Sequence, residues 1–150
     1  MQSTEIKVLD VDSQLVDKLW SRVEHSGSFY SIGDGVTKEN FRRVLYGSSY
    51  VVAIDGGIVR LDIGSDYVEL HPIAFSHAIF RNAHETIEAI YSRFVRSFQS
   101  KPICCIIPSE MRAAKVLAQL AGMHYEGVVY RLLSGVKLAC SVYSWRPENV

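Results

Sequence analysis

The sequence lacks an excess of charge of either sign. Its 150 residues carry 16 Lys and Arg against 16 Asp and Glu, so the formal net charge is zero with neutral histidines. Proteins that bind nucleic acid or anionic membranes favour a basic surface, and the balance therefore argues against both. Neutrality does not argue against a protein partner. Because it removes the repulsion between molecules in solution, it is compatible with a place in an assembly.

Long apolar runs and paired cysteines are also lacking. No apolar run approaches the roughly 20 residues that span a bilayer, and the first residues show no signal-peptide pattern. The cysteines number three, and Cys104 and Cys105 are adjacent. Neighbouring residues of a strand point to opposite faces, so a bond between these two is disfavoured. We expect buried, reduced thiols in a protein of cytoplasmic type.

No repeat, low-complexity tract or linker divides the chain. Hydrophobic residues make up 48% and charged residues 21%, the balance of a globular protein. The length is that of one ordinary domain, which we expect to cover residues 1–150. The most polar, glycine-rich stretch is Ser26–Gly35, and its length suits a surface loop between two helices.

The hydrophobic pattern of the first half predicts a strand, two helices and a meander of three strands. Asp12 and Ser13 are capping candidates for the first helix, and Thr37 for the second. Asp55 and Gly56 predict a tight hairpin, because this pair accepts the positive φ of such a turn. The expected strands cover residues 6–9, 50–54, 58–63 and 67–71.

The second half alternates helices with strands. Asn82 and Glu85 resemble a capping box before one long helix that continues to Phe98. Ser109 is the expected cap of another helix, and Gly122 suits its left-handed end. The expected strands cover residues 102–108, 124–133 and 136–143. The whole order is β-α-α-β-β-β-α-β-α-β-β, which predicts an α/β (or α+β) protein with a mixed sheet and helices on both faces.

This order resembles that of the GNAT superfamily of acetyl-CoA-dependent N-acetyltransferases, over nearly the whole chain. Residues 107–127 look like the last helix of the family and the turn after it, where the usual pattern is Asn-x-x-Ala, then Leu-Tyr, Gly-Phe and Glu-Gly. The residues that fall on this pattern are Ala114, Leu117, Gly122, Glu126 and Gly127. The resemblance implies a GNAT fold.

Two residues of that helix depart from the pattern where the family carries chemistry. The resemblance places Met111 at the position of the Asn that contacts the cofactor side. It places Ala118 at the position of the Tyr that protonates the departing CoA thiolate. Neither side chain forms hydrogen bonds to a thiolate or an amide.

The resemblance also implies a phosphate loop where the fourth strand meets the long helix. The family pattern is Arg/Gln-x-x-Gly-x-Gly/Ala, and glycines with a helix N-terminus suit a pyrophosphate. The aligned residues, the candidate cofactor site, are Arg81, Asn82, Ala83, His84, Glu85 and Thr86. Arg81 matches the pattern, whereas His84 and Thr86 replace glycines and Glu85 adds a negative charge. A helix cap made by Asn82 and Glu85 explains the same residues without a ligand.

Glu69 and His71 are the candidate catalytic residues. They share one face of a strand, and in a GNAT-like fold the corresponding strand often carries the general base. His71 has a suitable intrinsic pKa, and Glu69 would qualify if burial raised its pKa. The alternative is that both are partly exposed polar residues of the meander. No metal site is expected, because His71, His77 and His84 lack ligand spacing.

The chain end and the glycine-rich stretch are candidate contacts for a protein partner or a second copy. Trp145 and Arg146 are residue types favoured at interfaces, and Ser26–Gly35 carries Phe29, Tyr30 and Ile32. The alternative is that Trp145 folds back on the sheet edge. We expect no nucleic-acid or membrane partner.

Two functions follow from the resemblance. The departures at the cofactor site favour a scaffold without bound cofactor, similar to small GNAT-like bacteriophage virion and head-assembly proteins, with a virion as one location. This hypothesis predicts a cleft between the fourth and fifth strands that is filled by His84 or Phe80. The alternative is an acetyl-CoA-dependent N-acyltransferase in which an amine attacks the thioester directly.

Overall fold

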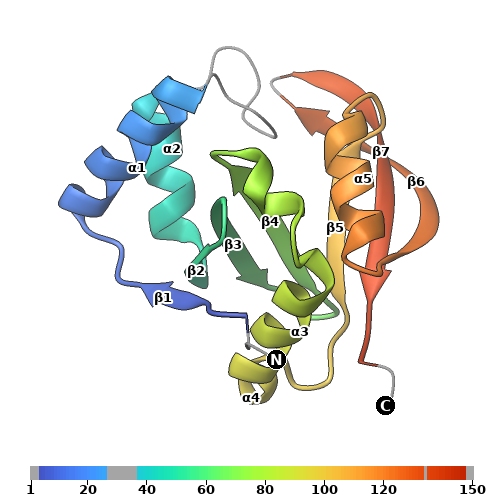
Figure 1. Ribbon diagram of the computed structural model, residues 1–150. Helices are drawn as coiled ribbons and strands as arrows, with labels where there is room; N and C mark the ends of the chain where they lie inside the picture. The colour runs from blue at the N-terminus through green and yellow to red at the C-terminus, as the bar shows by residue number, and fades with distance from the viewer. Residues whose placement is uncertain (1–3, 27–36, 134, 148–150) are drawn as a thin grey trace.

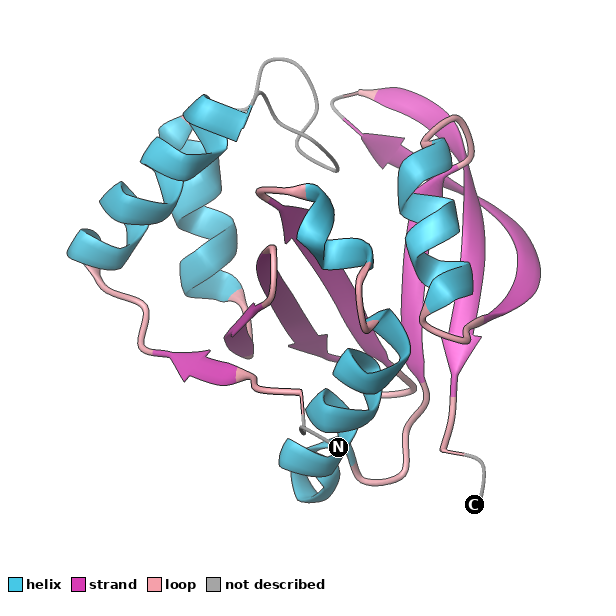
Figure 2. Cartoon of the chain, in the orientation of Figure 1, coloured by secondary structure: helices cyan, strands magenta, loops and turns pink. Residues whose placement is uncertain are grey.

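One mixed sheet with helices on both faces forms the protein (Figures 1 and 2). The computed structural model describes residues 4–26, 37–133 and 135–147. Its strands are β1 (Lys7–Leu9), β2 (Tyr50–Ile54), β3 (Gly57–Ile63), β4 (Val68–Ala74), β5 (Ile103–Pro108), β6 (His124–Leu133) and β7 (Val136–Trp145). Its helices are α1 (Ser13–Ser26), α2 (Lys38–Gly47), η1 (a 3₁₀ turn, His77–Phe80), α3 (Ala83–Arg93), α4 (Val95–Phe98) and α5 (Arg112–Leu120).

The sheet has the strand order β1-β2-β3-β4-β5-β7-β6. All neighbours are antiparallel except β4 and β5, which are parallel. The predicted mixed α/β architecture is confirmed, and the element order is the predicted one with η1 added and the long helix broken.

The helix caps and the tight turn predicted in the first half of the chain are present in the structure. The Asp12 carboxylate accepts a hydrogen bond from the Leu15 N–H at 2.8 Å, and the Thr37 hydroxyl accepts one from the Asn40 N–H at 3.1 Å. Each satisfies a donor that the first turn of a helix leaves unpaired. Gly56 has φ 82° in the turn between β2 and β3, which a residue with a Cβ rarely adopts.

Three details of the second half were predicted wrongly. Asn82 precedes α3 in a left-handed conformation, with φ 57°, and its side chain makes no capping hydrogen bond, so there is no capping box. Ser109 does not cap α5; Met111 holds the cap position, and the Ser109 hydroxyl pairs with that of Ser141. The long helix is interrupted at Phe94, where ψ is 20°.

The two faces of the sheet are covered by different helices. One face packs against α1 and α2 through Val51, Ile58 and Ile73. Phe41 and Leu45 are the buried residues that α2 contributes to this contact. The opposite face packs against α3, α4 and α5 in a larger core. Burial of each apolar face provides the main driving force for this layered arrangement.

The sheet splits between β4 and β5. The parallel ladder joins only Val68 with Ile103 and Glu69 with Cys104, whereas β5 pairs with β7 at six positions. Figure 1 shows the two strands close together where they begin and apart at their carboxyl ends. Pro72 lies in β4 beyond Glu69, the last residue of this strand that pairs with β5.

Candidate functional site

A cavity of about 230 Å³ occupies the space where β4 and β5 diverge. On the α3 and α5 side it is lined by Thr86, Ala114 and Ala118. On the other side of the sheet it reaches His71 and Arg131. Because successive strand residues alternate between faces, a cavity that touches Leu70 and His71 passes through the sheet. The cavity therefore joins the two faces at the place where the ladder is interrupted.

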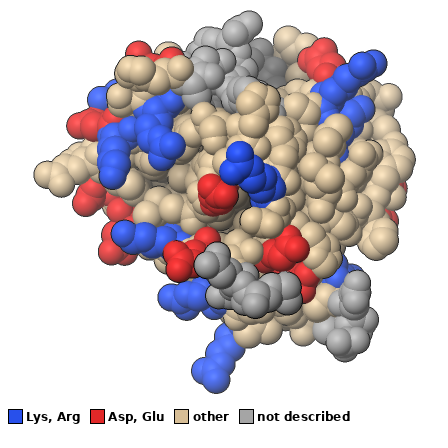
Figure 3. Space-filling model, viewed as in Figure 1, with Lys and Arg blue, Asp and Glu red and all other residues tan. Residues whose placement is uncertain are grey.

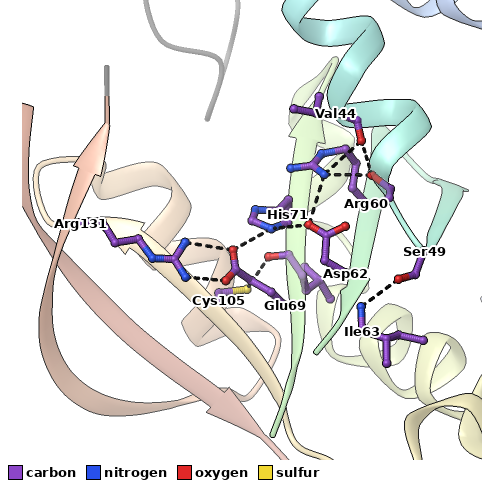
Figure 4. Close-up of polar contacts among 11 residues, drawn as sticks. Val44, Ser49, Arg60, Asp62, Ile63, Glu69, His71, Cys105 and Arg131 are labelled. Carbon is purple, nitrogen blue, oxygen red and sulfur yellow. Dashed lines mark hydrogen bonds and ion pairs between the residues drawn. The ribbon is translucent and has the colours of Figure 1, made fainter. Parts of the chain in front are cut away.

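Five charged or titratable side chains form a cluster at the α1/α2 end of this cavity (Figure 4). Arg131 of β6 makes two hydrogen bonds to Glu69, at 2.7 and 3.2 Å. The Nε2 atom of His71 lies 2.7 Å from Glu69 and 3.3 Å from Asp62. Arg60 lies 3.4 Å from Asp62 on the same strand. We call these five residues the charge cluster.

The carboxylate of Glu69 is held in its ionised form. Its side chain is 12% exposed, and burial by itself raises the pKa. The hydrogen bonds from His71 and Arg131 outweigh burial and lower the pKa of Glu69 to about 2. The condition for Glu69 to act as a base, a pKa raised by burial, is therefore not met. A carboxylate with this pKa takes up almost no proton at neutral pH.

His71 is the group of the cluster that is suited to proton transfer. Its Nε2 atom faces two carboxylates, and such an atom must carry a proton. This assigns the Nε2–H tautomer to the neutral ring and leaves the lone pair on Nδ1. Within the described part of the chain no hydrogen bond reaches Nδ1. His71 also lines the cavity, so its ring has access to the gap.

Burial favours the thiol form of the two cysteines near the gap, Cys104 and Cys105. The Cys105 thiol lies in the cavity wall and donates to the Leu70 carbonyl at 3.3 Å. Burial raises its pKa to about 12, and burial also raises the pKa of Cys104. Thiolates, not thiols, attack acyl groups. All three cysteines are free, as predicted, but only Cys105 and Cys140 are buried, whereas Cys104 is half-buried.

The predicted phosphate-loop residues lie at the start of α3. Arg81, Asn82, His84 and Glu85 are exposed, whereas Ala83 and Thr86 are buried and line the cavity. The first intrahelical bond runs from the Thr86 N–H to the Asn82 carbonyl, so the N–H groups of residues 83–85 have no helical acceptor. Asn82 has a positive φ, and asparagine is one of the residue types that tolerate this backbone conformation.

The prediction that His84 or Phe80 fills the cleft is wrong. Neither lines the cavity. The His84 ring is half exposed, pairs with Glu88 at 2.7 Å and lies against Gly122. Phe80 packs on the small cluster formed by Ala74 and Ile79. The short turn η1 carries Phe80 away from the gap, and this turn has no signal in the hydrophobic pattern.

Met111 and Ala118 do line the cavity, at the two positions where the family pattern has Asn and Tyr. Their side chains offer no hydrogen bond to it. Sequence reasoning missed three members of the charge cluster. Asp62 could have been found, because it pairs with Glu69 in the predicted meander, and Arg60 lies on the same face. Arg131 had no signal, since it lies on β6, 62 residues after Glu69 in the chain.

The predicted partner residues have different surroundings. Trp145 is 7% exposed and packs against Tyr91 with ring centres 5.4 Å apart, so it belongs to the core and not to an open surface. Arg146 is exposed. The Ser26–Gly35 loop lies outside the described residues apart from Ser26, the last residue of α1.

Charges of the two signs are interspersed on the face shown in Figure 3, without a large area of one sign. No helix in residues 4–26, 37–133 and 135–147 is long and apolar enough to cross a membrane. The same residues contain no group of three side chains that could hold a metal ion.

Comparison with known proteins supports the fold through structure and not through sequence. No protein-family model and no curated protein matches the sequence. Among solved structures, one similar protein is an acetyltransferase from Salmonella typhimurium that modifies the N-terminal serine of a 50S ribosomal subunit protein. Its TM-score is 0.74 and its sequence identity 12%, over 98% of this chain and 97% of that one. A GNAT-family acetyltransferase from Bacillus anthracis has a TM-score of 0.69 and 14% identity, over 97% and 96%.

A third similar structure contains a cofactor. The microcin C7 self-immunity acetyltransferase MccE, in complex with acetyl-CoA and AMP, has a TM-score of 0.65 and 13% identity, over 95% of this chain and 93% of that one. At these identities the likeness establishes architecture alone. Three observations support the same fold: the split sheet, the helices on its two faces and the structural match over nearly the full length. The chain has the fold of the GNAT acetyltransferases.

Proposed function

We propose that this protein is an acyl-CoA-dependent N-acyltransferase, with acetyl-CoA as the simplest donor. The observation that carries the proposal is the cavity through the sheet, which joins the start of α3 to the imidazole of His71. A thioester and an amine have to meet within a few ångströms for direct transfer, and the gap between β4 and β5 lets them approach from opposite faces.

The start of α3 is the candidate site for the CoA pyrophosphate. Three backbone N–H groups there have no helical acceptor, and the positive end of the helix dipole favours an anion. Ala83 lies at this end and in the cavity wall, so a ligand held by these N–H groups would continue directly into the cavity. Arg81 adds an exposed positive charge beside it. Glu85 is exposed as well, and its carboxylate has access to solvent.

His71 would act as the general base. Acetyl-CoA, when bound, would supply the thioester carbonyl that the amine attacks; the C–N bond forms, the C–S bond breaks, and CoA would leave as a thiolate that takes a proton from solvent. His71 takes the proton of the amine on Nδ1, and the imidazolium that results lies between the carboxylates of Asp62 and Glu69. Arg131 holds Glu69 ionised and oriented, so the cluster stabilises the charge that develops on His71. The high pKa of Cys105 is consistent with transfer that has no covalent enzyme intermediate.

An assay of CoA release tests this proposal. Purified protein is incubated with acetyl-CoA and a panel of amines that includes peptide N-termini, and the free thiol is measured. We expect turnover that falls by about 10²- to 10⁴-fold in His71→Gln, the usual effect of losing a general base. His124→Gln, an exposed histidine of β6, serves as the matched control and should keep full activity. Equal rates in His71→Gln and the wild type would refute the assigned role.

A scaffold without cofactor, including one in a phage virion, stays a separate prediction. The scaffold hypothesis predicts that side chains fill the cleft between β4 and β5, whereas a cavity of about 230 Å³ occupies this cleft. The replacements at Met111 and Ala118 remain its support. Binding of CoA is the property that separates a scaffold from an enzyme.

A further inference from the structure

We propose that two copies of this chain pair along the outer edge of β6 and join their sheets into one. This inference is independent of the proposed function, because it concerns the outer edge of β6 and not the binding of a cofactor. β6 is the last strand in the sheet order and, in the part of the chain that the structure describes, has β7 as its one neighbour. Figure 1 shows it as the outermost strand, beyond β7.

The outer edge of β6 lacks most of the features, such as short length, charge, proline and bulges, that normally keep an edge strand from pairing. The opposite edge of the sheet, β1, has two of them, since it spans three residues and carries Lys7. β6 spans ten residues, and its register irregularity lies near its start, between Tyr125 and Gly127. From Val128 to Leu133 it contains no proline and a single charged residue, Arg131. Among the described residues, the outward N–H and C=O groups of this segment have no strand to pair with.

One face of β6 presents a row of exposed apolar side chains. Of the eleven large hydrophobic side chains that are exposed in the described residues, five belong to this strand. Four of the five pair with positions 143, 141, 139 and 137 of β7, which alternate along that strand, so the four share one face of the sheet. They are Tyr125, Val128, Tyr130 and Leu132, and we call them the β6 row. Their exposed fractions run from 49% to 74%.

The single charged residue of this segment does not protect the row. Arg131 alternates with Tyr130 and Leu132 along the strand and therefore points to the other face, where it donates to Glu69 at 2.7 Å. Its charge is thus balanced by a carboxylate of the same chain. A second strand that approaches the β6 row meets apolar side chains and open backbone groups.

A second copy of the chain matches this edge when it runs antiparallel about a twofold axis at Tyr130. This register sets Val128 opposite the partner's Leu132 and the two Tyr130 rings opposite each other, so the pairs along the row are apolar. On the other face it sets Val129 opposite the partner's Arg131. An axis at Arg131 instead would set two guanidinium groups opposite each other, which is unfavourable. The net charge of zero adds no repulsion between the copies.

The area of the row indicates the strength of the contact. Since a buried tyrosine ring contributes about 200 Å², the four exposed fractions correspond to about 450 Å² per copy. The largest apolar patch of a typical monomer covers about 300–600 Å² and is often functional. Two rows offer at most about 900 Å², to which the strand backbone adds, and stable complexes begin at about 1,200 Å². We therefore expect a reversible dimer and not a permanent one.

Sedimentation equilibrium of the whole protein, from micromolar to submillimolar concentration, tests the proposal. The mass of the wild type should rise from 16.9 kDa toward twice this value. Tyr130→Lys sets two like charges opposite each other at the axis and should raise the dissociation constant by about tenfold or more. Tyr46→Lys is the matched control, because Tyr46 on α2 is also exposed and also has a cation over its ring, Arg42 at 5.0 Å where Tyr130 has Lys137 at 5.3 Å. It should leave the dissociation constant unchanged.

A mixture of two further variants tests the register. Val128→Lys and Leu132→Glu each set charges against apolar side chains of the partner, and each should be monomeric alone. Mixed in equal amounts they should dimerise again, because a lysine of one chain then lies opposite a glutamate of the other. Both positions are exposed, so both variants should keep the fold, as judged by their thermal transitions.

Two kinds of result would overturn the proposal. A wild type that stays at 16.9 kDa at every concentration would leave the edge of β6 to a strand of a different protein. A dimer that Tyr130→Lys leaves intact, or a mixture of Val128→Lys and Leu132→Glu that stays monomeric, would show that the copies do not pair along β6 in this register.

Discussion

The pair formed by Arg131 and Glu69 leads to a quantitative prediction about stability and pH. The pKa of Glu69 falls from 4.5 to about 2 on folding, and at 1.36 kcal/mol per pKa unit this corresponds to about 3 kcal/mol. Hydrogen bonds from His71 and from Arg131 both contribute to this lowering. Because the Arg131 side chain is 36% exposed, solvent screens its share, and we expect Arg131→Met to cost about 1 kcal/mol at pH 7.

The cost should depend on pH in a defined direction. A carboxyl group with a lowered native pKa stabilises the fold fully above its unfolded pKa of 4.5, and this stabilisation is lost as the pH falls toward 2. Urea denaturation of wild type and Arg131→Met, repeated between pH 7 and pH 2.5, measures the difference in the free energy of unfolding. The difference should be constant above pH 5 and shrink below it.

Arg146→Met is the control for this experiment. Arg146 is exposed and donates only to the Ser100 carbonyl among the hydrogen bonds of the described residues, at 3.5 Å, so its loss should change stability little at any pH. A difference for Arg131→Met that is absent at pH 7, or that stays constant down to pH 2.5, would refute the assignment of the pKa shift to this contact.

Three further predictions concern the backbone and the thiols. Gly56→Ala should lower the free energy of unfolding by at least about 2 kcal/mol, because Gly56 has φ 82° and the added Cβ would collide with the Ile79 backbone. Gly47→Ala is the control, because an added Cβ there has no atom within 4 Å, and equal Tm values for the two variants would contradict this reasoning. Thr37→Ala should cost about 1 kcal/mol through loss of the cap on Asn40, measured in urea, and restoration by Thr37→Ser is expected. Native Cys105 should resist alkylation at pH 8 and react on unfolding, as followed by mass spectrometry, because it is 4% exposed with a pKa of about 12; rapid modification of the folded protein would contradict its burial.

The fold was predictable where the signals are local. A side chain that caps a helix, such as Asp12 or Thr37, acts on a residue three positions away, and Gly56 acts within its own turn. These interactions depend on sequence neighbours alone, so the pattern identifies them. The break at Phe94 and the turn η1 have no signal in the hydrophobic pattern and were missed, although the Ser76 hydroxyl caps η1 by accepting a hydrogen bond from the Ala78 N–H at 3.3 Å.

The candidate site was predictable only in part. Glu69 and His71 were identified because they share a strand face, but their chemistry depends on Arg131, which lies 62 residues after Glu69 in the chain. Hydrogen bonds from His71 and from Arg131 together lower the pKa of Glu69, whereas burial by itself would raise it, and so reverse the expected role of this residue. The open cavity was missed for a similar reason. Whether His84 or Phe80 enters the gap depends on η1 and on the conformation of Asn82, which residue types do not determine.

The central claim is that the cavity between β4 and β5 receives the CoA thioester beside His71. Backbone amide chemical shifts, followed by NMR as acetyl-CoA is added, test this most directly. Saturable shifts are expected at the start of α3 (residues 83–86), in β4 around His71 and in β5 around Cys105, the segments that line the cavity. Absence of shifts at millimolar acetyl-CoA, or shifts confined to α1, which contributes no residue to the cavity lining, would contradict it.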